Sequence, residues 1–167
     1  MPPRSKMERA AYVRNFIFGV EDSLVSTVGL VSGVAIAGVD RPTIFLTGMV
    51  LIVVEALSMG VGSLLAESSA EEFIFRRGRS LRLPLTGAGI MLVSYFLAGF
   101  IPLGPYLLAD VQQAFILSIC NSLAALFLLG ALSARYFGAD ILKNGARMLL
   151  LGGLAVAAGT FVGALIN

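Results

Sequence analysis

Five apolar stretches, each long enough to cross a lipid bilayer, constrain this chain more than any other feature of its sequence. A membrane-spanning helix needs about 20 predominantly apolar residues. Only 13% of the residues are charged, against about 25% in soluble domains. The sequence therefore predicts an all-α integral membrane protein, with a polar arm at residues 1–14 and a five-helix transmembrane domain at residues 15–167. We expect the spans at residues 15–39, 43–66, 83–101, 111–134 and 147–166.

The positive charges orient these spans. All but one of the twelve Lys and Arg residues fall in three segments: the N-terminal arm, the loop after the second span and the loop after the fourth span. Because the spans alternate in direction, the three segments lie on one side of the membrane. Basic loops face the cytoplasm. We therefore expect a multi-pass protein with a cytoplasmic N-terminus and an extracytoplasmic C-terminus, in the cell membrane of a prokaryote.

Two scarce residue types exclude several classes of site. Histidine is absent and Cys120 is the single cysteine. These counts exclude His-based metal sites, Cys-based zinc sites and disulfide frameworks, as well as Ser-His-Asp and Cys-His catalytic arrangements. We expect a protein that is not an enzyme, has no tightly bound cofactor and does not bind nucleic acid.

Two carboxylates lie inside the apolar stretches, Asp22 in the first span and Glu55 in the second. An ionisable group at the centre of a membrane helix costs roughly 2.5–3.5 kcal/mol on insertion scales, so it marks a candidate functional site. Met59 follows Glu55 by four residues and shares its helix face. Because carboxylates suit hard cations and thioethers suit softer ones, this combination indicates a metal site.

The depths of these three side chains are compatible with one site. At about 1.5 Å per residue, Asp22 and Met59 lie roughly 10 Å from the cytoplasmic ends of their spans, and Glu55 lies roughly 16 Å deep. The first two spans are antiparallel neighbours joined by a short turn, so the three positions overlap in the inner half of the bilayer. Gly29 and Gly33 form a GxxxG pair in the first span, which favours close helix packing, including across a dimer.

Several of these motifs also occur together in one known family. EDSLVSTVGLVSG at residues 21–33, EALSMGVGSLLA at residues 55–66 and IPLGPYLL at residues 101–108 resemble the vacuolar iron transporter family, and the similarity covers roughly residues 15–166. The resemblance implies a homodimer of five-helix protomers that exports Fe²⁺, and in some members Mn²⁺, from the cytosol in exchange for protons. It also implies a metal path at the dimer interface, lined by Asp22 and Met59, with the metal as transported substrate.

Two features depart from that family. Its better-known members carry a helical, glutamate-rich cytosolic domain between the second and third spans, whereas this chain has only a short basic loop there. The acidic residue that often follows SMG-x-G in the family is replaced here by Ser63. The second helix is predicted to continue beyond its span as an amphipathic extension. That extension carries a possible metal-attracting cytoplasmic cluster of Glu67, Glu71 and Glu72.

Each candidate also has a purely structural interpretation. Glu21 and Asp22 can form an interfacial acidic pair that balances Arg14, Glu55 can be a hydrogen-bonded structural carboxylate, and Met59 can fill a packing gap. The glutamate cluster can be a solvated helix face opposite the basic loop at residues 76–82. For the whole chain, the alternative to a transporter is a non-transporting membrane scaffold or stress-related protein that retains the fold.

Overall fold

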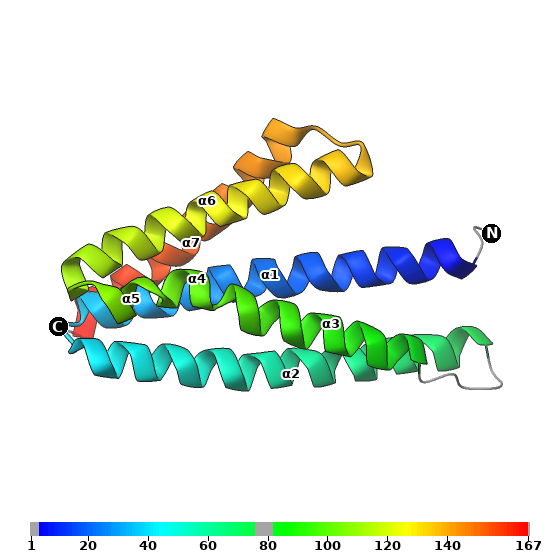
Figure 1. Cartoon of the computed structure of the whole chain (residues 1–167), viewed down its shortest axis with the longest axis horizontal. Helices are drawn as coiled ribbons and strands as arrows, with labels where there is room; N and C mark the ends of the chain where they lie inside the picture. The colour runs from blue at the N-terminus through cyan, green and yellow to red at the C-terminus, as the bar shows by residue number, and fades with distance from the viewer. Residues whose placement is uncertain (1–3, 76–81, 167) are drawn as a thin grey trace.

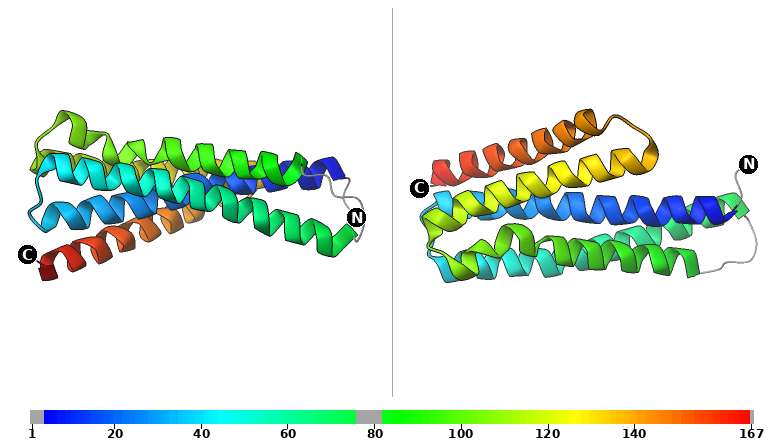
Figure 2. Two further views of the ribbon diagram at one scale, coloured as in Figure 1. Left: turned by 90° about the horizontal axis from the view of Figure 1, so that it is seen from below. Right: turned by 45° about the horizontal axis from the view of Figure 1, so that its top comes forward.

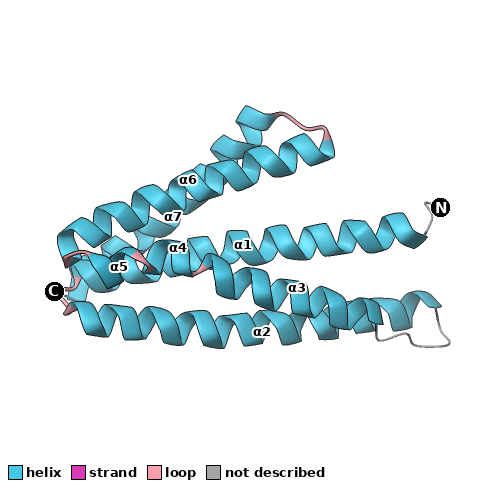
Figure 3. Ribbon diagram, in the orientation of Figure 1, coloured by secondary structure: helices cyan, strands magenta, loops and turns pink. Residues whose placement is uncertain are grey.

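The structure, a computed structural model, describes residues 4–75 and 82–166, and all regular structure in those ranges is helical (Figure 3). Within the same ranges, five segments are long and apolar enough to cross a membrane. The predicted all-α fold with five spans is therefore confirmed, and the chain is a multi-pass membrane protein. The long helices are α1 (Arg4–Ile36), α2 (Arg41–Phe75), α3 (Arg82–Ala98), α6 (Val111–Phe137) and α7 (Ile141–Ile166).

Helix α1 is the centre of the bundle. It packs against all four of the other long helices, with α2 and α3 on one side and α6 and α7 on the other (Figures 1 and 2). The N-terminus, the end of α2 and the α6–α7 turn lie at one end of the bundle, which we call the basic end (Figure 1). The α1–α2 turn and the C-terminus lie at the opposite end, so the alternation expected from the charges is present.

The glycine pair of α1 packs against α7 of the same chain. A Cβ atom on Gly33 would lie 2.6 Å from the Gly159 carbonyl oxygen, and one on Gly163 would collide with the Gly33 carbonyl oxygen. Small residues let membrane helices approach until their backbones touch, and that is what these helices do. The GxxxG prediction of close packing is confirmed. Helix α7 of the same protomer occupies the space beside these glycines, however, so they give no support to a dimer contact there.

The third span ends in two short helices. Helix α3 stops at Ala98, and α4 (Phe100–Leu103) and α5 (Pro105–Leu108) follow it. Pro105 is the first residue of α5, where its missing N–H costs no helical hydrogen bond. The short helices bring Leu103 and Tyr106 into the bundle, where both are buried.

Helix α2 is longer than its span, as the sequence predicts. It continues without a break through Glu67 to Phe75, so the predicted continuation of the helix is confirmed, although Glu67 is buried and Phe73 is exposed. Its outward face carries exposed apolar side chains, including Val54, Leu57 and Val61, which is the pattern of a lipid-facing helix surface. The inward face carries the polar residues described next.

Candidate functional site

Four side chains at four-residue spacing form one polar stripe along α2: Glu55, Met59, Ser63 and Glu67. Residues four apart lie on one face of a helix. Each of the four is buried or partly buried, whereas the apolar residues beside them, such as Val54 and Leu65, are exposed. The stripe therefore faces the bundle and not the lipid.

At the basic end, the stripe is tied to α1. Asn15 is buried and donates from Nδ2 to Glu67 Oε1 at 2.7 Å and to Ser63 Oγ at 3.2 Å. Arg14 Nη2 lies 3.3 Å from the same Glu67 oxygen. Gly87 of α3 provides the space on the third side, because a Cβ atom there would lie 2.5 Å from Glu67 Oε2. The three helices therefore enclose this carboxylate together.

A cavity of about 750 Å³ lies along the stripe. Arg14 and Phe137, both exposed, line it together with Glu21 and Met59, which lie further along α1 and α2. Sulfur and oxygen groups thus line one space between α1, α2 and α3, with Phe137 of α6 also in its lining. The complete lining is Arg14, Asn15, Ile17, Phe18, Glu21, Met59, Gly62, Ser63, Ala66, Glu67, Met91 and Phe137.

Asp22 directly follows Glu21 of the cavity wall, and Glu55 lies one helical turn beyond Met59 of that wall. The Glu55 carboxylate is close enough for its charge to act on Asp22. The Tyr95 hydroxyl of α3 lies within the range of both charges and is hydrogen-bonded to Ser26 Oγ at 2.7 Å. Ser23 Oγ donates to the Tyr95 carbonyl oxygen at 2.6 Å. Two serines on α1 therefore fix Tyr95 beside the carboxylate pair.

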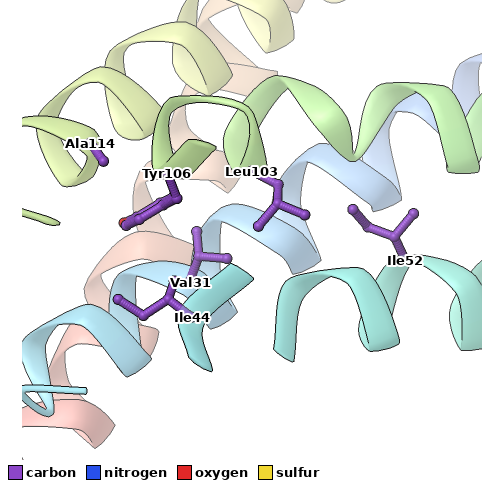
Figure 4. Close-up of a cluster of buried hydrophobic side chains, with 6 residues drawn as sticks. All are labelled: Val31, Ile44, Ile52, Leu103, Tyr106 and Ala114. Atoms are coloured by element: carbon purple, nitrogen blue, oxygen red, sulfur yellow. The ribbon is translucent and has the colours of Figure 1, made fainter. Parts of the chain in front are cut away.

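Beyond the carboxylates, the buried side chains are mostly apolar, and the polar groups among them are the hydroxyls of residues such as Thr27 and Ser32. A cluster of buried side chains fills the opposite end of the bundle and joins α1, α2, α4, α5 and α6 (Figure 4). Ile52, one turn beyond Glu55 along α2, is fully buried and so is Leu103. Because each member excludes water, this cluster closes the bundle on that side. Its members are Val31, Ile44, Ile52, Leu103, Tyr106 and Ala114.

The structure brings together part of the predicted site. Asp22 and Glu55 are neighbours, and Met59 lies one turn from Glu55 on the cavity wall. Among the described residues, no group of three or more Asp, Glu or Cys side chains is arranged to hold a metal ion. Any metal bound here would therefore also need thioether, hydroxyl or amide ligands, or groups from a second protomer.

Two sequence-based interpretations prove wrong. Arg14 pairs with Glu67, so it does not balance Glu21 and Asp22 as an interfacial partner. Glu67 is buried, whereas Glu72 is exposed, so the predicted cluster of three glutamates is not one solvated face. The proposed opposing loop, residues 76–82, lies almost wholly outside the described residues.

Three functional candidates were missed: Asn15, Ser26 and Tyr95. Each is a polar side chain in or beside an apolar stretch. Asn15 and Ser26 share the face of α1 that carries Asp22, at spacings of seven and four residues. That periodicity was available in the sequence. The position of Tyr95 opposite Ser26 was not, because it depends on the packing of α3.

Comparison with known proteins places the sequence in a family. The sequence matches the VIT family over residues 13–82 and 73–164. It is 24% identical to Vacuolar iron transporter 1 of Tulipa gesneriana, over 87% of this chain and 83% of that protein. It is 28% identical to Vacuolar iron transporter homolog 1 of Arabidopsis thaliana, over 90% of this chain and 80% of that protein. Since the match includes all five spans and the polar stripe, the chain belongs to the VIT family.

Proposed function

We propose that this protein exports divalent metal ions, Fe²⁺ and also Mn²⁺, from the cytosol in exchange for protons. The observation that carries the proposal is the pair of neighbouring carboxylates, Asp22 and Glu55, inside two membrane-spanning helices. Such groups are costly in a membrane unless they serve an ion or proton pathway. The relatives named above are iron transporters by name, which favours a metal as the ion.

The direction of transport follows from the charge distribution. The basic end carries the positively charged segments, so the positive-inside rule assigns it to the cytoplasm. The cavity then faces the cytosol and the apolar cluster faces the other side. This shape corresponds to a state that is ready to accept a cation from the cytosol. The cell membrane of a prokaryote is the membrane we expect.

The exchange needs only one set of carboxylates. A carboxylate must lose its proton before it binds a metal, so metal binding releases protons. If the same group then faces the other side, it releases the metal and accepts a proton there. Asp22 is the proposed metal ligand and Glu55 either a second ligand or the proton carrier. Met59 supplies a sulfur that favours Fe²⁺ over harder cations.

Assembly as a homodimer is part of the proposal. Among its described residues, a single chain has no group of three or more acidic side chains arranged around one metal position. A second copy placed with Asp22 near the two-fold axis doubles the number of carboxylates. Cross-linking of single cysteines introduced beside Asp22 tests this arrangement. Links that form only through α6 would count against it.

A second candidate is a non-transporting scaffold that keeps the fold. The lack of a three-carboxylate site among the described residues is the observation that favours it. Reconstitution into proteoliposomes separates the two. A transporter takes up Fe²⁺ or Mn²⁺ and moves protons in the opposite direction, whereas a scaffold does neither.

A further inference from the structure

Glu67 is a buried carboxylate with only half of its hydrogen-bonding capacity used. The residue is 9% exposed. Its Oε1 atom accepts hydrogen bonds from Asn15 and Arg14. Its Oε2 atom is buried and has no partner within the described part of the chain. Because a carboxylate offers about four acceptor positions, and a buried acceptor without a partner is costly, this carboxylate has unused capacity to accept a positive charge, although its Oε2 atom is packed against Gly87.

The two partners of Glu67 differ in how firmly they are held. Asn15 is 3% exposed and is also bonded to Ser63, so it is a fixed part of the wall. The Arg14 side chain is 68% exposed and approaches with a single nitrogen at 3.3 Å. An ion pair between a solvent-exposed side chain and a carboxylate contributes little to stability. Arg14 can therefore leave Glu67 without unfolding the site, whereas Asn15 cannot.

The cavity that Glu67 lines suits a divalent cation of intermediate hardness. Ser63 lies one turn from Glu67, Met59 lies two turns away at about 12 Å, and Glu21 and Met91 line the same cavity, so an ion meets these groups in succession. Oxygen and thioether groups together favour ions such as Fe²⁺ over Mg²⁺ or Ca²⁺. Glu67 is also twelve residues from Glu55 along α2, a distance of about 18 Å at 1.5 Å per residue. One ion cannot contact both carboxylates, so Glu67 belongs to a separate site.

We propose that Glu67 is the first binding site for a divalent cation arriving from the cytosol, and that Arg14 is an internal competitor that occupies it when no metal is bound. The identity of the cation rests on the proposed transport function. The binding site itself does not rest on that function, because it is argued from the contacts of Glu67. An arriving ion displaces the Arg14 guanidinium from Oε1 and binds the Glu67 carboxylate in its place, and it then moves along the cavity past Met59.

Opposite effects of two substitutions test this proposal. Glu67→Gln keeps the shape and the Asn15 contact but removes the charge. It should raise the KM for Mn²⁺ uptake in proteoliposomes by at least about tenfold, the loss typical even of an outer-shell partner of a metal, with little change in maximal rate. Arg14→Gln removes the competitor, so it should lower the KM several-fold. If the ion pair between Arg14 and Glu67 is purely structural, both substitutions should shift the KM in the same direction.

Two matched controls separate local competition from general charge effects. Arg135→Gln removes an exposed positive charge near the basic end, away from the cavity lining. Asp110→Asn removes an exposed carboxylate at the other end, where it makes no side-chain cap. Both should leave the KM unchanged. If Arg135→Gln lowers the KM as much as Arg14→Gln does, the effect is one of surface potential and the proposal is overturned.

Direct binding distinguishes failure of this site from failure of the transport function. Mn²⁺ is titrated against the purified Asp22→Asn protein, and the free Mn²⁺ signal is followed by electron paramagnetic resonance. The proposal predicts a remaining site that disappears in Asp22→Asn/Glu67→Gln and tightens in Asp22→Asn/Arg14→Gln. All three proteins should elute from a sizing column as folded protein. If Asp22→Asn and the two double variants then bind Mn²⁺ equally, the Glu67 site is refuted, even if transport is confirmed.

Discussion

The two halves of the interface that α1 forms with α2 and α3 bury opposite kinds of side chain. Toward the basic end, α1 meets its neighbours through Asn15, Ser63 and Glu67 beside a cavity of about 750 Å³. Toward the opposite end, it meets them through Val31, Ile52 and other apolar groups with almost no exposure. The same helices thus line a cavity in one half and a mostly apolar cluster in the other, which the proposed function interprets as a route for an ion and a barrier to it.

The position of the change from polar to apolar is informative. Asp22 and Glu55 lie at the boundary, next to the cavity wall, and Glu55 lies one turn before Ile52. In the proposed function, an ion at this point has reached the last carboxylates on the proposed cytosolic side. For the ion to continue, the helices must move apart in the apolar half. The proposed carboxylates therefore lie where a transporter that alternates between two open states needs its binding site.

The largest effect is expected from filling the glycine contact between α1 and α7 in the apolar half. Gly33→Leu places a side chain against the Gly159 backbone, which cannot move aside as a side chain does. Overpacking of this kind typically costs about 1–3 kcal/mol, and more where backbone must shift. The measurement is the fraction of folded protein on a sizing column after heating.

Gly153→Leu on α7 is the control, because a Cβ atom there has no neighbour within 4 Å. Equal thermal stability of the two variants would contradict the close α1–α7 contact. For the same reason, we do not expect Gly33→Cys to form disulfides between protomers.

Cysteine labelling tests whether only one half admits water. In a background with the exposed Cys120 replaced by alanine, Ser63→Cys lies on the cavity wall and should react with a membrane-impermeant thiol reagent. Ile52→Cys replaces a fully buried side chain and should stay unreacted from either side. If Ser63→Cys and Ile52→Cys are labelled to a similar extent, water does not distinguish the two halves and the comparison fails.

Replacing a sulfur should affect the two halves differently. Met59→Leu keeps volume and apolarity, so it should cost about 1 kcal/mol or less in stability. It should reduce Fe²⁺ uptake more than Mn²⁺ uptake, because thioether ligands favour softer ions. Met49→Leu on the same helix, packed against the apolar cluster, should change neither. An unchanged Fe²⁺ to Mn²⁺ ratio in Met59→Leu would assign Met59 to packing.

The smallest expected effect compares two buried tyrosines. Tyr95→Phe loses the hydrogen bond to Ser26, a loss of about 1 kcal/mol. Tyr106→Phe removes a buried hydroxyl that has no partner in the described structure, so it should be neutral or stabilising. The melting temperatures of the two variants provide the test. A larger loss in Tyr106→Phe would contradict the proposed division between polar and apolar halves.

The sequence predicts the spans well because each depends only on its own residues. The apolar stretch around Glu55 is long enough to span the membrane whatever it packs against, and the continuation of α2 to Phe75 is also a local property. Asp22 and Met59 could be singled out because a charged group or a repeated motif is visible within one helix. These predictions required no knowledge of the other helices.

The contacts of the site depend on residues that are distant in sequence. Glu67 is buried because Asn15, 52 residues away, bonds to it and because Gly87 leaves space on a third helix. Nothing in the neighbourhood of Glu67 distinguishes it from the exposed Glu72. In the same way, the GxxxG pattern indicates that α1 packs closely, but only the structure identifies α7 as its neighbour.

The most direct test of metal–proton exchange at the carboxylate pair is the transport activity of Asp22→Asn. The substitution keeps the shape of the side chain and removes its charge. In proteoliposomes with Fe²⁺ or Mn²⁺, we predict no metal uptake and no metal-driven proton movement, from protein that elutes from a sizing column as the unmodified protein does. Normal proton-coupled uptake by a well-folded Asp22→Asn protein would contradict the account.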